Sequence, residues 1–255
     1  MVSKEILTIR NLTKSYHTKS SETLAVTDFS LTIFEGEFIV IVGPSGCGKS
    51  TILSILSGLL EPSSGEIIYH SKENSLNIGY MLQNDHLFPW RTILKNVILG
   101  LEIQGRATQQ NVDKVKSQLE MYGLGKFIYS YPNQLSGGMR QRAALIRTLA
   151  INPDIFLLDE PFSALDYQTR LAVSEDIVSI LKKEKKTVIM ITHDLNEAIS
   201  MASKVIVISK RPGRIVHAHD IQLSSEGESM LEKRKAPEFM DYYNQIWKEL
   251  DVHVE

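Results

Sequence analysis

A glycine-rich segment at residues 43–51 has the composition of a phosphate-binding loop. It matches the pattern G-x-x-x-x-G-K-[ST], follows the apolar run 37–42, and precedes a helix predicted from Ser50 to Ser57, which stops at Gly58. Glycines let backbone N–H groups turn towards an anion, and a helix start adds a favourable field. Lys49 is expected to neutralise the β- and γ-phosphates and Ser50 to offer Mg²⁺ a hydroxyl. The predicted phosphate-binding residues are Gly43, Pro44, Ser45, Gly46, Cys47, Gly48, Lys49, Ser50 and Thr51.

Two adjacent carboxylates follow a second apolar run, Ile155 to Leu158. A buried strand of this kind would deliver Asp159 and Glu160 to its carboxyl end, where open α/β sheets bind ligands. Asp159 can then hold Mg²⁺, directly or through water, and Glu160 can accept a proton from an attacking water. Acidic residues at strand ends are also common in ordinary turns. The pair therefore indicates a catalytic site only because the chain also contains the phosphate loop.

Two further polar residues are expected near this edge. His193 follows the apolar run 187–192 and is positioned to touch the γ-phosphate and the water, although a histidine at a strand end is usually a surface residue. Gln83 is a neutral amide that could order the metal-bound water and report whether the γ-phosphate is present. The predicted catalytic residues are Glu160, His193, Gln83 and Lys49, and the predicted Mg²⁺ ligands are Ser50, Gln83 and Asp159.

Composition narrows the functional classes. The chain has 255 residues, 43% hydrophobic content, a net charge of -2 and a pI near 6.4, so nucleic acid is not the expected partner. Its one cysteine, Cys47, cannot form an internal disulfide, which is compatible with a reducing cytosol. We find no run near the ~20 apolar residues of a membrane span and no apolar signal core. The chain itself is expected to be soluble, and a membrane role would require a partner.

The hydrophobic pattern predicts an α/β fold. Residues 7–12 and 29–33 have the character of half-buried antiparallel strands, joined through a polar turn from His17 to Glu22. Short apolar runs at 38–42, 155–158, 188–191 and 205–208 are typical of a mostly parallel sheet. Between Leu94 and Leu149 the pattern is helical. We therefore expect a P-loop NTPase core with a mostly parallel sheet, an N-terminal antiparallel β subdomain and an inserted α-helical subdomain.

The predicted boundaries give one domain over residues 1–255. Residues 1–83 and 151–220 form the nucleotide-binding core, 84–150 the helical subdomain, and 221–255 a C-terminal extension. In the extension, apolar residues at helical spacing predict an amphipathic helix that docks on its own domain, with a regulatory or dimer contact as the alternative. Ser224 to Lys235 are expected to be a solvated connection. His217 and His219 could face the same way on a strand, but two imidazoles without a third ligand are a weak metal site.

From about Leu7 to about Val216, the chain resembles the ATPase subunits of ATP-binding cassette transporters. The hallmarks occur in order: Tyr16, the phosphate loop, Gln83, the signature Leu135 to Arg142, Asp159-Glu160, Ser163 to Asp166, and His193. The resemblance implies that ATP and Mg²⁺ bind, that Tyr16 stacks on adenine, and that Asp166 crosses a dimer interface. It also implies that the signature meets the ATP of the opposite subunit.

The signature itself fits that role. Ser136 is a suitable helix N-cap, and Gly137 with Gly138 would leave backbone N–H groups accessible at a helix start. One compact fold could not apply both the phosphate loop and the signature to one phosphate chain. Two copies related head to tail by a two-fold axis could, which predicts a homodimer with two equivalent ATP sites.

A run of apolar residues from Leu87 to Trp90 would be costly to expose, and a patch of this kind often marks a binding surface. By resemblance, the region Gln83 to Arg91 receives the membrane permease, and the alternative is packing beneath the helical subdomain. The sequence from Met81 to Ile103 is similar to that of the importer branch for nitrate, taurine and alkanesulfonates. This branch also includes ATPases for other small metabolites such as thiamine precursors. An extracytoplasmic solute-binding protein and a location on the cytoplasmic face of the inner membrane follow from this resemblance.

Two alternatives remain at this stage. A soluble, non-transport ATPase of DNA repair or translation would carry a long coiled coil between the motifs or two cassettes in tandem, and this chain has neither. A non-catalytic nucleotide-binding regulator is disfavoured by the presence of Glu160 and His193. The transported solute cannot be deduced from this sequence, because selectivity lies in the permease and the binding protein.

Overall fold

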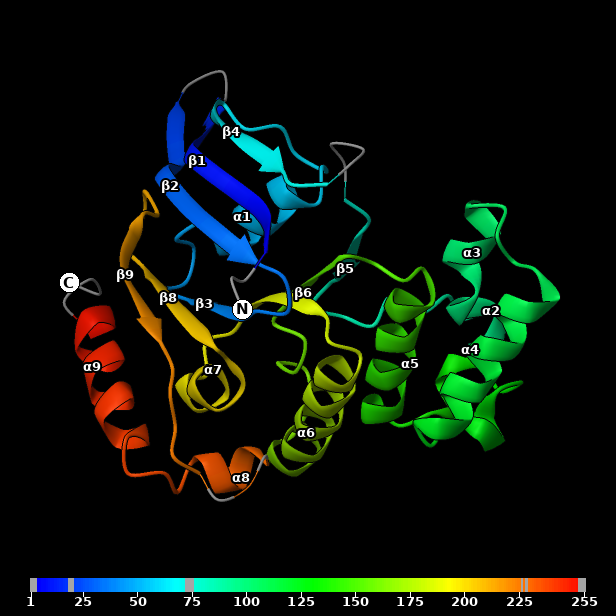
Figure 1. Cartoon of the computed structure of the whole chain (residues 1–255). Coiled ribbons are helices and arrows are strands. Elements are labelled where there is room, and N and C mark those ends of the chain that lie inside the picture. The colour runs from blue at the N-terminus through cyan, green and yellow to red at the C-terminus, as the bar shows by residue number, and fades with distance from the viewer. Residues whose placement is uncertain (1–3, 18–20, 72–75, 226, 228, 252–255) are drawn as a thin grey trace. The chain divides into compact units, whose positions relative to one another are not determined.

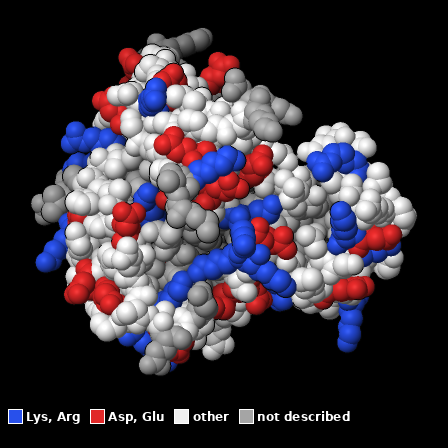
Figure 2. Space-filling view, in the orientation of Figure 1, with Lys and Arg blue, Asp and Glu red and all other residues white. Residues whose placement is uncertain are grey.

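The computed structural model describes residues 4–17, 21–71, 76–225, 227 and 229–251. The chain forms two compact units, one from residues 1–76 and 184–255 and the other from 77–183 (Figure 1). In the described part, no helix is both long enough and apolar enough to cross a membrane. Lys and Arg side chains are interspersed with Asp and Glu on the face that Figure 2 shows.

The first unit contains the predicted antiparallel sheet, with strand order β2-β1-β4. β1 (Glu5–His17) pairs with β2 (Glu22–Phe34), and β4 (Ser64–Tyr69) pairs with the other edge of β1. Along β2, Phe29 and Ile33 are buried while Ser30 is exposed, as the alternating pattern predicts. The strand β4 carries no pattern from which it was predicted. The predicted turn from His17 to Glu22 falls in part on residues 18–20, which lie outside the described residues.

The same unit contains β3 (Phe38–Val42), which pairs in parallel with β7 (Thr187–Ile191) and β8 (Lys204–Ile208). β9 (Ile215–Asp220) pairs antiparallel with β8. Every residue of β3 and β7 is buried, which explains their continuous apolar sequence. α1 (Lys49–Leu56) packs against β2, and α7 (Leu195–Met201) packs against β3.

The C-terminal extension packs on this unit. α9 (Phe239–Asp251) contacts α7 and β8 and buries Phe239 and Ile246, so the predicted docking of the amphipathic helix is confirmed. The expectation of a solvated connection from Ser224 to Lys235 is wrong for its second half. α8 (Met230–Lys233) begins after the cap Ser229, packs against α7 and buries Met230, because this apolar side chain finds cover there. Residues 226 and 228 of that segment lie outside the described residues.

The second unit combines two parallel strands with helices. β5 (Ile78–Met81) pairs with β6 (Ile155–Asp159), and α5 (Gly137–Ala150) packs against β5 and against α6 (Tyr167–Lys183). The predicted helical segment contains α2 (Ile93–Val97), α3 (Leu99–Ile103), α4 (Gln109–Met121) and the short 3-10 helices Gly125–Phe127 and Pro132–Gln134. Its apolar residues form one core. The boundaries at residues 83/84 and 150/151 stay a prediction.

Candidate functional site

The glycine-rich loop joins β3 to α1 in the first unit, in the predicted order of strand, loop and helix. Gly46 and Gly48 have φ angles of +73° and +105°, a region that side chains disfavour. A Cβ at Gly48 would lie 2.8 Å from the carbonyl oxygen of Ala25. The loop therefore needs glycine at position 48 both for its backbone angle and for its close approach to β2.

Two positively charged side chains, Lys49 and Arg211, donate hydrogen bonds to carbonyl groups of this loop. Lys49 is buried, and its Nζ donates hydrogen bonds to the carbonyl oxygens of Gly43 at 2.7 Å and Pro44 at 2.9 Å. The Arg211 guanidinium donates to the carbonyl oxygen of Gly46 through Nε at 3.1 Å and Nη2 at 2.8 Å. Lys49 was predicted from the motif, whereas Arg211, which follows β8, carries no local sequence signal. Together they concentrate positive charge at the start of α1.

Tyr16 lies near the end of β1 and is 41% exposed. Its hydroxyl lies 3.3 Å from Oγ1 of Thr51 in α1, and the Nζ of Lys14 lies 5.6 Å from the ring centroid. The hydroxyl contact holds the ring beside the helix that follows the phosphate loop, with much of its surface open to solvent. This geometry suits stacking against a flat ligand.

His193 follows β7 and is exposed. Thr192 fixes the turn that carries His193. Its hydroxyl donates to Oε2 of the buried Glu197 at 2.7 Å and accepts from the Asp194 N–H at 3.1 Å. Asp194 caps α7 by accepting from the N–H groups of Asn196 and Glu197. Thr192 and Glu197 were not predicted, because a contact between a strand end and a helix interior has no signature in the sequence.

In the second unit, β6 delivers Asp159 and Glu160 to its carboxyl end, as predicted. The Tyr80 hydroxyl of β5 donates to Oδ2 of Asp159 at 3.3 Å. Nε2 of Gln83 donates to the Ser163 hydroxyl at 3.1 Å, and that hydroxyl donates to the Glu160 carbonyl oxygen at 3.0 Å. Gln83 and Glu160 are thereby linked through one serine.

Glu160 has a φ angle of +44°, in the left-handed region. Residues other than glycine, asparagine and aspartate rarely adopt this conformation, and it occurs here where the chain turns directly after β6. The Ser163 N–H donates to the Glu160 carbonyl oxygen at 3.2 Å across that turn.

The signature segment begins α5. Ser136 is the N-cap, and its hydroxyl oxygen accepts a hydrogen bond from the Met139 N–H at 3.3 Å, which confirms the predicted cap. A Cβ on Gly138 would lie 2.7 Å from Cγ2 of Val173 and 3.1 Å from Cγ2 of Thr169. Gly138 is buried, and the absence of a side chain allows α5 to lie close to α6.

Asp166 lies just before α6 and accepts a hydrogen bond from the Thr169 N–H at 3.1 Å. Hydrogen bonds from the Thr169 side chain, and then from its backbone, lower the pKa of the Asp166 carboxyl. The carboxylate therefore stabilises the first turn of α6, while it stays on the surface.

The segment 83–91 is bound to α5 through two arginines. Nε of Arg140 donates to Oδ2 of Asp85 at 3.0 Å, and Arg147 donates to the carbonyl oxygens of Asp85 and His86, both at 2.7 Å. Burial lowers the pKa of the Arg147 guanidinium, and the Asp85 carboxylate opposes that shift. The segment is thereby joined by hydrogen bonds to the helix that carries the signature.

The apolar run 87–90 divides into two environments. Leu87 is 7% exposed and packs in the helical core, so its predicted place in an exposed patch is wrong, because α2 and its neighbours supply apolar cover. Phe88 and Trp90 are 37% and 71% exposed, and their ring centroids lie 5.0 Å apart. The fully buried Asn96 fixes their loop by accepting from the Phe88 N–H and donating to the carbonyl oxygens of Phe88, Arg91 and Thr92.

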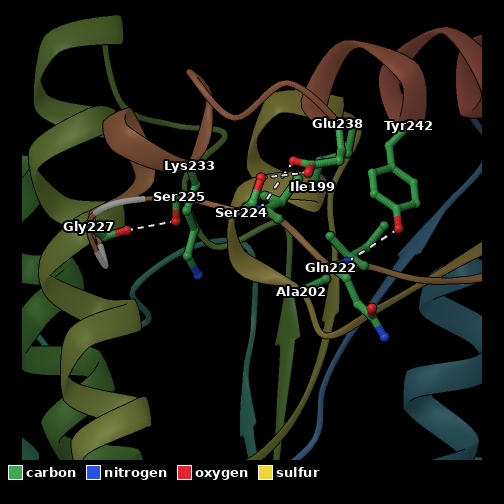
Figure 3. Close-up of a pocket in the computed structure, with 11 residues that line it drawn as sticks. Ile199, Ala202, Gln222, Ser224, Ser225, Gly227, Lys233, Glu238 and Tyr242 are labelled. Atoms are coloured by element: carbon green, nitrogen blue, oxygen red, sulfur yellow. Dashed lines mark hydrogen bonds between the residues drawn. The ribbon is translucent and has the colours of Figure 1, made fainter.

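A separate pocket of about 870 Å³ lies in the first unit beside α7. Figure 3 shows Ser224 bound to Glu238, Gln222 to Tyr242 and Ser225 to Gly227 around it. The predicted site residues are not among its lining residues. The pocket is a feature of the C-terminal extension, distinct from the phosphate loop.

The predicted site residues thus fall into two groups. The first unit brings together Tyr16, the loop 43–51 and His193 on the ends of β1, β3 and β7. The second unit brings together Gln83, Asp159 and Glu160, and carries the signature on α5. A phosphate-binding loop between strand and helix, with acidic residues ending another parallel strand, defines a P-loop nucleotide-hydrolysing protein.

Comparisons with known proteins identify the family. Residues 26–163 match the family model described as ABC transporter, and the chain belongs to this family. It is 43% identical over 248 residues to the uncharacterized ABC transporter ATP-binding protein YtlC of Bacillus subtilis, covering 96% of this chain and 95% of that protein. The nitrate import ATP-binding protein NrtD of Synechocystis is 37% identical, covering 94% and 93%. The taurine import ATP-binding protein TauB of Yersinia pestis is also 37% identical, covering 89% and 93%.

A solved structure agrees in fold. The dimeric post-hydrolysis state of the ATP-binding cassette MJ0796, bound to ADP and phosphate, superposes with a TM-score of 0.71 at 32% identity. It covers 85% of this chain and 99% of that chain. The chain is thus an ATP-binding ATPase subunit of an ABC transporter, and the predicted fold class is confirmed.

Proposed function

We propose that this chain powers the import of a small solute through a separate membrane permease. The proposal rests mainly on the structure of the loop 83–91. It presents the exposed Phe88 and Trp90 and is bound to α5, the signature helix, by Arg140 and Arg147. Such a loop could transmit the state of the nucleotide to a membrane partner.

The residues of the first unit fit a nucleotide. Gly46 and Gly48 allow the loop to curve, Lys49 lies within it, and α1 begins at its end. We assign the phosphates to residues 43–51, with Lys49 exchanging its carbonyl partners for phosphate oxygens, and adenine to the exposed face of Tyr16. Lys49, as a charge already held in place, stabilises negative charge that develops during phosphoryl transfer.

The carboxylates and hydroxyls present also suit Mg²⁺, which prefers oxygen ligands. We assign its binding to Ser50, Asp159 and Gln83; when bound, Mg²⁺ neutralises phosphate charge. Tyr80 orients Asp159 through its hydrogen bond, and the Ser163 bridge holds Gln83 at the same strand ends as Glu160. Glu160 accepts the proton of the attacking water, and His193 contacts the γ-phosphate.

We further propose that two copies enclose two ATP molecules head to tail. The capped, glycine-rich start of α5 offers a second anion site, and the structural relative MJ0796 is dimeric. In this arrangement Ser136, Gly137 and Gly138 of one copy face the phosphates held by the other, and Asp166 lies at the contact between copies. Catalysis then requires closure of the dimer.

The permease contact is tested by affinity capture from membranes that contain the cognate permease. A double variant, Phe88→Ala with Trp90→Ala, is expected to lose permease capture while its ATP binding stays unchanged. Tyr129→Ala removes a side chain that is equally exposed, at 71%, and serves as the matched control. Capture by the double variant at the wild-type level, or co-purification of the wild type with ribosomes or DNA, would contradict the proposal.

For the solute, we propose a nitrate-, sulfonate- or taurine-like molecule delivered by an extracytoplasmic binding protein, with the ATPase on the cytoplasmic face of the membrane. Support comes from the relatives NrtD and TauB, whose names state nitrate and taurine import. Uptake of labelled taurine, an alkanesulfonate and nitrate should be compared in cells with and without this chain. Uptake of all three that is independent of the chain, with uptake of a thiamine precursor that depends on it, would shift the assignment to another importer substrate.

A further inference from the structure

Three potential metal ligands converge where the C-terminal helix meets the edge of the sheet. His217 and His219 lie on β9, and Glu249 lies in the last turn of α9, which runs beside β9 in Figure 1. One nitrogen of each imidazole and a carboxylate oxygen of Glu249 all lie within 4.8 Å of one another. The third ligand that the sequence could not show is thus supplied by a helix about 30 residues further along the chain.

One contact within this cluster has the length of a hydrogen bond, and a second contact is longer. Nε2 of His219 lies 2.9 Å from Oε2 of Glu249, and Nδ1 of His217 lies 3.6 Å from Oε1 of the same carboxylate. The two rings are stacked, with centroids 4.6 Å apart and planes 17° apart. A single hydrogen-bonded pair, His219 with Glu249, would suffice to dock the helix, and it does not require a second imidazole turned towards the same carboxylate.

The surroundings favour a bound ion over a solvated charge. His219 and His217 lie opposite the buried Val205 and Val207 of β8 and share their face of the sheet. The side chain of His219 is 5% exposed and that of Glu249 17%, whereas His217 is 54% exposed. Two ligands are therefore held by packing, and the third is free to turn and gives an ion access from solvent.

We propose that His217, His219 and Glu249 bind one Zn²⁺ ion and so fasten α9 to β9. Imidazole and carboxylate ligands suit Zn²⁺, at bond lengths of about 2.0–2.2 Å and so about 3.3 Å between ligand atoms at a tetrahedral centre. Rotation of the half-exposed His217 ring can close the remaining gap, and water completes the coordination. This site is independent of the nucleotide site, whose oxygen ligands suit Mg²⁺ instead.

The test is calorimetric titration of the full chain with Zn²⁺ after treatment with a chelator, in excess Mg²⁺. We expect one equivalent of Zn²⁺ to bind. His217→Ala and Glu249→Gln should each weaken binding by at least about 100-fold, since even partners outside the ligand shell change metal affinity by about 10–100-fold. His17→Ala, which removes an exposed histidine that lies 3.8 Å from Glu22, is the matched control and should bind normally.

Neither variant should prevent folding, because His217 is exposed and the amide of glutamine can keep a hydrogen bond to His219. A cooperative thermal unfolding transition of each variant in chelator checks this. A Co²⁺ absorption spectrum of the wild type should show nitrogen and oxygen ligation. Absence of stoichiometric Zn²⁺ binding, wild-type binding by both variants, or a thiolate-to-cobalt band from Cys47 would overturn the proposal.

Discussion

At the residue scale, the phosphate loop depends on Gly48, which combines a positive φ angle with a close approach to β2. We predict that Gly48→Ala lowers ATP affinity by at least about tenfold, which corresponds to about 1.4 kcal/mol. The reason is that the new Cβ would lie 2.8 Å from the Ala25 carbonyl oxygen, which forces the loop to move. Binding of a fluorescent ATP analogue measures the effect.

Gly58→Ala is the matched control for this prediction. Gly58 has a similar φ angle of +75°, but a Cβ there would meet no heavy atom within 4 Å. It shares the backbone cost without the collision, so ATP affinity should be unchanged. An equal loss of affinity in both variants would show that the contact with β2 is unimportant.

A second prediction at this scale concerns Asp166. Because Thr169 lowers the pKa of this carboxyl, the stabilising cap of α6 is fully present above the unfolded-state pKa and is lost as the pH falls through the lower, folded-state pKa. Thr169→Val keeps the side-chain shape and removes the hydroxyl, so the titration midpoint of Asp166 should rise. Carbon chemical shifts across the acid range measure it, and an unchanged midpoint would contradict the account.

Single residues also show where sequence reasoning succeeds. The phosphate loop, Asp159, Glu160 and the cap Ser136 could be predicted, because each depends on a local motif or on the last residue of an apolar run. Arg211, Tyr80 and Ser163 could not, since each acts through a contact that only the folded backbone creates. Glu249 is the clearest case, because nothing near it in sequence relates it to His217.

At the scale of elements, the apolar runs predicted the buried strands β3, β6, β7 and β8 almost to the residue, since strands buried on both faces leave little choice of side chain. β4 was missed because its sequence is short and largely exposed or half-buried. Leu87 was misplaced because a loop residue next to a helical core can turn inwards, while Phe88 beside it does not.

The loop that presents Phe88 depends on a buried amide in α2. We predict that Asn96→Ala lowers the free energy of unfolding of the chain by about 1–3 kcal/mol, the cost of leaving buried backbone groups without partners. The Phe88 amide, which donates to Asn96 at 2.7 Å, should also exchange with solvent faster. Denaturant titration and hydrogen exchange measure the two effects.

The exposed Gln110→Ala in α4 is the control and should change neither quantity. If Asn96→Ala left both the stability and the Phe88 exchange rate at wild-type values, the loop would have to be fixed by Arg140 and Arg147 instead. That result would show that Asn96 of α2 does not order the loop.

At the scale of the whole molecule, the described structure holds one half of the proposed catalytic machinery in each unit. The phosphate loop with its lysine belongs to residues 1–76 and 184–255, and the carboxylates with the signature belong to 77–183. In the proposed head-to-tail dimer, the phosphate loop of one copy meets the signature of the other, so hydrolysis waits for closure of the dimer.

The central claim is that Glu160 is the base in an ATP-dependent dimer, and the most direct measurement is the turnover and oligomeric state of Glu160→Gln with saturating Mg²⁺ and ATP. Glutamine keeps the size of the side chain but cannot accept the proton. We predict retained ATP binding, hydrolysis slower by about 10²–10⁴-fold and accumulation of a dimer by light scattering, whereas the control Glu120→Gln in α4 behaves as wild type. Wild-type turnover in Glu160→Gln, or a chain that stays monomeric with ATP bound, would contradict the account.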